Sequence, residues 1–94
     1  IVYPSDLAHI AAMIDLARTP KQIGAIIRRT RKSHGLSQSA LGDKTGFRQE
    51  TISLIETGNP AAKLETILAV LAALNLELRI VPRSRSSANI EDIF

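Results

Sequence analysis

A chain of 94 residues has the length of one domain, and a monomer of this size buries only about 60 to 65 % of the surface that its unfolded chain exposes. Hydrophobic residues make up 45 % of it, but only Tyr3, Phe47 and Phe94 are aromatic, which favours helices packed through aliphatic side chains. The lack of cysteine excludes disulfides and thiolate catalysis. No apolar run is long enough to span a bilayer, so we expect no membrane association, and the lack of cysteine fits a reducing cytoplasm.

The net charge of +3 is less informative than the position of the charges. From Lys21 to Arg48 there are seven basic residues and one acidic residue, Asp43. Such clustering suits a polyanion such as nucleic acid. A solvated helix face is the commoner explanation of a charge run, so charge alone leaves both interpretations open.

Two helices are expected in the first third of the chain. Residues 4–18 repeat apolar side chains at helical spacing after Ser5, which can cap them. A second helix, about residues 20–34, starts at Thr19, where Pro20 suits the first helical position and Gln22 completes a capping box. Gly35 can end it in a left-handed conformation.

The next two predicted helices are short and close together. One runs from the capping Ser37 to the stop at Gly46, and the other from about Arg48 to Thr57, before Gly58. Two helices joined by a tight turn containing glycine form the DNA-binding helix-turn-helix, whose second helix lies in the major groove.

The last predicted helix, about residues 64–75, is apolar almost all round and needs burial on more than one side. Residues 76–81 then alternate as a strand does, up to Pro82. Because one strand cannot satisfy its own backbone, we expect it to pair with its copy in a homodimer. The predicted dimerisation residues are Leu76, Leu78 and Ile80. The predicted organisation is thus an extra N-terminal helix (1–18), a DNA-binding domain (19–75), a dimerisation strand (76–82) and a flexible tail (83–94).

Residues 35–58 resemble the Xre and lambdoid phage repressor family, with Leu36-Ser37-Gln38 opening the first helix of the motif and residues 52–58 closing the second. The resemblance implies an all-α fold, a five-helix lambda-repressor-like helix-turn-helix domain that includes the extra N-terminal helix, followed by one C-terminal strand that pairs across a homodimer. In that family a Ser or Thr often caps the last helix where this chain has Lys63, so an earlier start at residues 59–60 is an alternative.

Within the family the chain is most similar to HipB-type antitoxins, through residues 19–35, the RQETIS segment at 48–53 and residues 74–81. This implies a transcriptional repressor that pairs strand to strand, binds a palindromic operator in its own operon and neutralises a HipA-type serine/threonine kinase. The surface or the tail is expected to bind that kinase, because Ile90, Ile93 and Phe94 have helical spacing at the end of a polar segment. A frayed chain end is the other interpretation of these three residues. A free-standing repressor without a toxin partner is the alternative.

Six residues on or beside the second helix of the motif are expected to face DNA. Arginine pairs with guanine and glutamine with adenine, and the Thr51 methyl or the Leu54 side chain could contact a thymine methyl. Glu50 could accept from cytosine N4, face solvent or brace Arg48. The predicted set is Arg48, Gln49, Glu50, Thr51, Ser53 and Leu54.

Further roles are implied by the resemblance or by charge. Gln38 matches a family residue that holds a backbone phosphate and braces the second helix, and Arg31 and Glu56 match a structural ion pair. Exposed cations on the helix at 20–34 are candidates for phosphate contacts that position the protein without reading sequence: Arg28, Arg29 and Lys32.

Nothing in the sequence points to catalysis. His9 and His34 are far apart, no Ser-His-Asp order or metal-ligand spacing occurs, and there is no glycine-rich phosphate loop. We therefore expect neither an enzyme nor a bound metal or cofactor.

Overall fold

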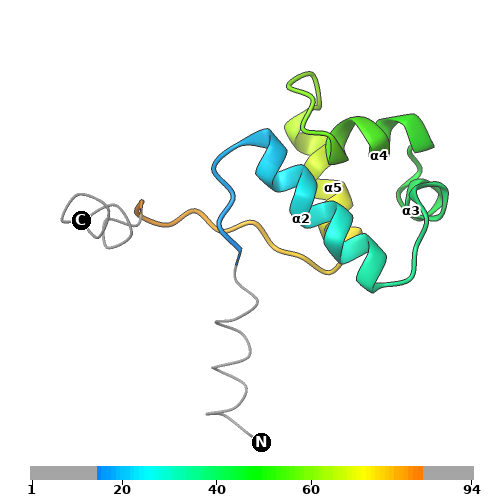
Figure 1. The fold of residues 1–94 in the computed structure, drawn as a ribbon, viewed down its shortest axis with the longest axis horizontal. Helices are drawn as coiled ribbons and strands as arrows, with labels where there is room; N and C mark the ends of the chain where they lie inside the picture. The colour runs from blue at the N-terminus through cyan, green and yellow to red at the C-terminus, as the bar shows by residue number, and fades with distance from the viewer. Residues whose placement is uncertain (1–14, 84–94) are drawn as a thin grey trace, which may run out of the picture.

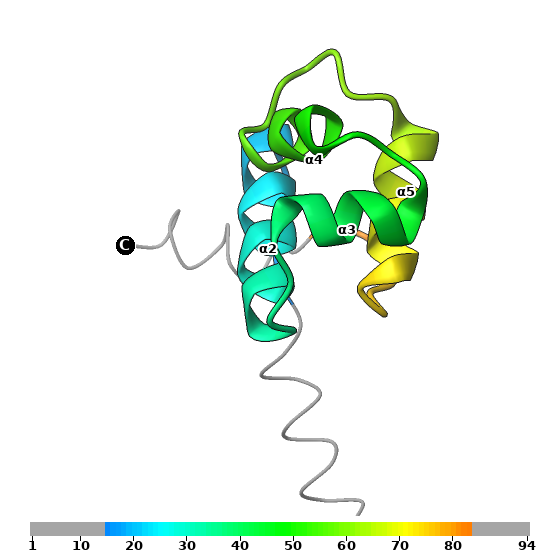
Figure 2. The same ribbon diagram turned by 90° about the vertical axis from the view of Figure 1, so that its right-hand side faces the viewer.

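The computed structural model describes residues 15–83. They form four helices: α2 (Pro20–Ser33), α3 (Gln38–Thr45), α4 (Gln49–Glu56) and α5 (Leu64–Ala73). α4 packs on α2 and α3, and α3 also packs on α5, so that the two short helices join the two longer ones (Figures 1 and 2). The helix-turn-helix predicted from the sequence is therefore present as α3, the turn and α4.

The predicted first helix, residues 4–18, lies mostly outside the described residues, and the part that is described, residues 15–18, is not helical. The start of α2 explains this. Thr19 is its extended N-cap, with its side chain accepting from the Gln22 backbone N–H, and the Gln22 side chain accepts from the Arg18 N–H at 2.6 Å. A capping box would engage the Thr19 N–H instead, so the expected box is shifted by one residue and holds Arg18 outside a helix.

One aliphatic core joins the four helices. Each contributes at least one buried side chain, and the five largest that are fully buried are Ile27, Leu41, Ile52, Val70 and Leu74. α5 begins at Leu64 and not at 59–60, and it buries only one side, because Leu64 and Leu68 are exposed. Within the described residues, α5 therefore keeps an exposed apolar side.

Two glycines allow helices to approach closely. A Cβ on Gly24, in the middle of α2, would lie 2.6 Å from the Glu56 carbonyl oxygen, and one on Gly42 would lie 2.6 Å from the Phe47 carbonyl oxygen. Real Cβ atoms do not come so close to other heavy atoms. The α2–α4 crossing and the tight α3–α4 turn both depend on the missing side chain, and a Gly46 φ of 80° completes the turn.

Residues 76–83 leave the end of α5 as an extended segment, drawn yellow to orange in Figure 1. The predicted strand at 76–81 is not confirmed, because no strand occurs within the described residues. A strand is defined by a neighbour to which it bonds, and this segment has no such neighbour within the described chain. Its side chains point largely to solvent, with Ile80 95 % exposed.

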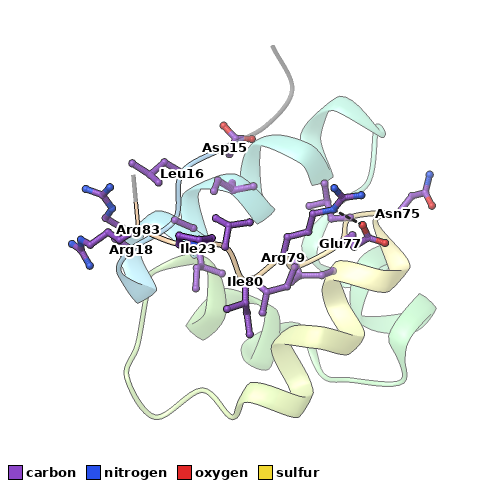
Figure 3. A pocket seen from close by; sticks show the side chains of 16 residues that line it. Asp15, Leu16, Arg18, Ile23, Asn75, Glu77, Arg79, Ile80 and Arg83 are labelled. Carbon is purple, nitrogen blue, oxygen red and sulfur yellow. Dashed lines mark hydrogen bonds and ion pairs between the residues drawn. The ribbon is translucent and has the colours of Figure 1, made fainter. Parts of the chain in front are cut away.

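A groove of about 830 Å³ runs between residues 15–18, α2, the end of α5 and residues 76–83. Ile23 and Ile26 of α2 and Leu71 of α5 line it, and Figure 3 shows Ile23 together with Ile80 of the extended segment. Ile23 and Ile26 are only half-buried, so α2 offers apolar surface beyond the core. In the part of the chain that the structure describes, no helix is both long and apolar enough to cross a membrane.

Candidate nucleic-acid interface

The outer face of α4 carries the predicted base-contacting residues. Ile52, Ile55 and Glu56 turn inward, while the predicted residues lie exposed or half-buried on the other side: Arg48, Gln49, Glu50, Thr51, Ser53 and Leu54. Arg48 is the N-cap and not a helical residue, with φ −77° and ψ 155°, and its side chain makes no capping bond. Its guanidinium is therefore not committed to the helix start.

A chain of hydrogen bonds connects the start of α4 to the core. The Gln49 Nε2 donates to the Gln38 Oε1 at 2.5 Å, and the Gln38 Nε2 donates to the Glu56 Oε1 at 3.1 Å. Arg31 donates twice to Glu56, at 2.6 and 3.0 Å, and once to the Leu36 carbonyl oxygen. The chain ties together α2, α3 and both ends of α4, with Glu56 bonded to both Arg31 and Gln38.

The Arg31–Glu56 pair is deeply buried, with side chains 9 % and 2 % exposed. Burial alone would raise the pKa of Glu56, but the hydrogen bonds from Arg31 and Gln38 and the charge of Arg31 outweigh it and hold this pKa below its ordinary value. The hydrogen bond to Glu56 likewise raises the pKa of Arg31 despite desolvation. Both groups therefore stay charged, and among the described residues no buried polar side-chain atom lacks a partner.

The three cations predicted to hold phosphates are all exposed on α2. Lys32 lies four residues after Arg28 and three after Arg29, so it is a neighbour of both on the helix surface. The charge of Arg28 contributes to the low pKa of Glu56. Arg29 pairs with Asp15 at 2.7 Å, both side chains being well exposed. Of the three cations, only Arg29 has an ion pair within the described residues.

Glu50 is exposed in the first turn of α4. No ion pair joins it to Arg48, although both residues lie within the described part of the chain. Of the three roles considered for Glu50, bracing of Arg48 is not seen, and the carboxylate faces outward beside the other candidate base contacts.

Two features of this surface were not identified from the sequence: the hydrogen bond between Gln49 and Gln38, and the position of Lys63 beside α4. The Gln49–Gln38 bond joins two helix starts that are 11 residues apart, and the signal for it is a glutamine at the first position of each helix of the motif. Lys63 is the exposed N-cap of α5 and lines a hollow beside α4. A cation just after the turn at 58–60 is the corresponding sequence signal.

Comparisons with known proteins agree with this arrangement. Residues 27–81 match the helix-turn-helix family model. A helix-turn-helix-type transcriptional regulator of Sinorhizobium fredii, itself described as uncharacterized, is 34 % identical over 64 residues, which cover 68 % of this chain and 84 % of the relative. Antitoxin HipB of Escherichia coli K12 is 29 % identical over 79 residues, which cover 78 % of this chain and 90 % of HipB.

Solved structures show the same likeness. One chain of the HipA–HipB–O2–O3 complex superimposes with a TM-score of 0.70 at 27 % identity, over 76 % of this chain and all of that one. A chain of the HipB–O4 20mer complex gives the same TM-score, identity and coverage. The described fold is thus HipB-like.

Proposed function

This chain belongs to the helix-turn-helix family, and we propose that it is a sequence-specific repressor that binds a palindromic operator as a homodimer and serves as the antitoxin of a HipA-type kinase. The family makes it a DNA-binding transcriptional regulator and not an enzyme. The dimer, the operator and the toxin are the proposed part. As a regulator of DNA, the protein would act in the cytoplasm.

The observation that carries the proposal is the hydrogen-bonded Gln49. Its Nε2 has two hydrogens, one of which is used by Gln38. The remaining N–H and the Oε1 are a donor and an acceptor side by side, which is what adenine N7 and N6 require in the major groove. The bond to Gln38 fixes which end of the amide is which, so Gln49 is preorganised to read adenine.

The other exposed positions on α4 complete a reading face. Arg48, free of capping, can pair with guanine O6 and N7, and Glu50 can accept from cytosine N4. Thr51 and Ser53 are half-buried residues of the same helix. The second N–H of the Gln38 amide is left for a phosphate next to the bases.

Cations around the motif are assigned to phosphates. Arg28 and Lys32 are exposed without an ion pair among the described residues, and Arg29 can reach a phosphate by giving up its exposed bond to Asp15. An exposed pair of this kind is worth at most about 1 kcal/mol, so the bond to Asp15 is a small obstacle.

The antitoxin part rests on the relatives. Antitoxin HipB and chains of HipB–operator and HipA–HipB–operator complexes are similar to this chain over about three quarters of its length. The predicted kinase contacts, Ile90, Ile93 and Phe94, lie outside the described residues. A kinase encoded beside this gene and recovered with the protein from its host supports the antitoxin; if neither is found, the free-standing repressor stands in its place.

Two substitutions test the assignment of roles. Loss of a base contact at Gln49→Ala should cost about 1 to 3 kcal/mol per half-site and relax preference at one base pair. Loss of a phosphate contact at Arg29→Ala should weaken operator and scrambled DNA alike and reduce the salt slope by about one per subunit, which is about two for the dimer. The measurement is fluorescence anisotropy on the DNA upstream of the gene, over a series of salt concentrations. If Gln49→Ala weakens both DNAs equally, α4 does not read the sequence.

A further inference from the structure

A shallow hollow of about 280 Å³ lies between α4 and the segment that leads into α5. Thr51 and Leu54 form its α4 side, Ala61 and Ala62 its opposite side, and Phe47 closes it near the α3–α4 turn. Four of these five side chains are wholly apolar and the fifth, Thr51, carries a methyl group. The hollow therefore suits a small apolar group presented next to the outer face of α4.

Leu54 is the unusual residue of this surface. It is 46 % exposed, and it lies four residues after Glu50, on the same outward stripe of α4. The polar neighbours Gln49, Glu50 and Ser53 give the stripe hydrogen-bonding groups but no apolar contact. A large aliphatic side chain held half in water at this point gains free energy only when something covers it.

The charges around the hollow indicate what covers it. Lys63 lines it, and Arg48 directly follows the lining residue Phe47 in the chain. Both are exposed cations with no ion pair within the described residues. An apolar hollow lined by a cation, with a second cation next to it in sequence, matches a DNA groove, in which phosphates flank the bases, better than the apolar surface of a protein.

We propose that this hollow receives the 5-methyl group of a thymine in the operator, with Leu54 as the specificity-determining contact. The 5-methyl of thymine is the apolar group that the bases present in the major groove. The inference rests on the proposed DNA-binding function and adds to it a fixed A·T base pair in each half-site. Thr51, half-buried at the back of the hollow, supplies a wall, and Leu54 supplies the surface that the methyl covers.

The test removes the methyl group alone. A preferred duplex is first recovered from a random-sequence pool with the full chain, and each thymine is then replaced singly by deoxyuridine, which keeps every hydrogen bond. Burial of one methyl predicts about fourfold weaker binding for one thymine in each half-site, and about fifteenfold when both symmetric copies are replaced. Other thymines should change binding by less than about 1.5-fold, since they bury no methyl.

Two variants identify the residue that reads the methyl. In Leu54→Ala the ratio of affinities for the thymine and deoxyuridine duplexes should fall to about one. Lys63→Ala is the matched control from the same rim: it should weaken both duplexes by one common factor and keep the fourfold ratio, because it removes a charge and not an apolar surface.

The outcomes separate this inference from the proposed function. If a preferred duplex is recovered and every thymine tolerates deoxyuridine, or if Leu54→Ala keeps the ratio, the methyl site is wrong while the repressor stands. If the pool gives no preferred duplex, sequence-specific binding itself is refuted, and the methyl site with it.

Discussion

The buried pair of Arg31 and Glu56 makes the geometry of the reading face depend on one carboxylate. Glu56 accepts from Arg31 on one side and from Gln38 on the other, and Gln38 in turn holds Gln49. A change at Glu56 therefore reaches the outer face of α4 through two hydrogen bonds, without any contact between Glu56 and DNA.

The low pKa of Glu56 predicts a pH dependence of stability. In the folded chain this pKa lies below its ordinary value, so the unfolded chain binds more protons at acidic pH. The stabilisation is fully present above the unfolded pKa of about 4.3 and is lost as pH falls through the lower folded pKa. Urea unfolding between pH 3 and pH 7 should show this loss in the wild type.

Replacement of one or both partners tests the same pair. Glu56→Gln leaves Arg31 buried without a counter-charge and should cost about 3 kcal/mol at pH 7. The double variant Arg31→Met, Glu56→Met should be about as stable as the wild type, lack its acid dependence and still bind the operator less tightly, because Gln38 has lost its acceptor. An unchanged acid slope in the double variant would assign the slope to other groups.

At the scale of the helices, the features set by local signals could be predicted from the sequence, and the features set by tertiary contacts could not. The starts of α2 and α3 were predictable because Thr19 and Ser37 act on backbone groups three residues away. The close approach at Gly24 was not, because helix propensity counts a mid-helix glycine only as a cost and the reason for it lies in α4. The same holds for the Gln49–Gln38 bond, which joins two helices.

For Gly24→Ala, the close contact predicts a change of stability opposite in sign to the change that helix propensity predicts. Propensity alone would make Gly24→Ala more stable by about 1 kcal/mol. The added Cβ would meet the Ile55 and Glu56 carbonyl oxygens and push α4 away from α2, so we expect a loss of about 1 to 3 kcal/mol. The measurement is urea unfolding followed by circular dichroism.

The matched control for Gly24→Ala is a substitution at the next residue, Ala25. Ala25 is exposed on α2, and Ala25→Gly should cost only the propensity difference of about 1 kcal/mol. Operator binding should fall more in Gly24→Ala than in Ala25→Gly, because only the former moves α4. A Gly24→Ala variant that is more stable than the wild type would refute the close packing.

At the scale of the whole molecule, large apolar side chains remain exposed within residues 15–83, the part that the structure describes. Exposed apolar residues occur on α5 and on the extended segment, among them Leu64, Leu68, Leu78, Ile80 and Val81. The groove lined by Ile23 and Ile26 opens on the same segment. For residues 76–81 the alternation showed which side chains are apolar but not what they meet, since no strand partner for them lies within the described residues.

The proposed dimer is tested at Leu78, which is not part of the buried core of the subunit. Proline there removes a backbone donor from any ladder, so Leu78→Pro should sediment as a monomer while the helical circular dichroism of α2 to α5 is retained. Leu78→Ala, which shortens the side chain but keeps the donor, should remain a dimer at somewhat lower affinity. Unchanged dimerisation of Leu78→Pro would rule out pairing through this segment.

Operator binding is a second measurement of whether the protein dimerises through Leu78. A dimer places two copies of α4 in successive major grooves, about 34 to 36 Å apart, so both half-sites contribute to one binding event. The monomeric Leu78→Pro variant should therefore bind a full operator no more tightly than an isolated half-site, whereas the wild type should prefer the full operator strongly.

Moving the half-sites apart by five base pairs turns one of them to the opposite face of the DNA, about half a helical turn. That insertion should abolish the preference of the wild type and leave the variant unaffected, and a wild type indifferent to the spacing would not bind as a two-fold dimer.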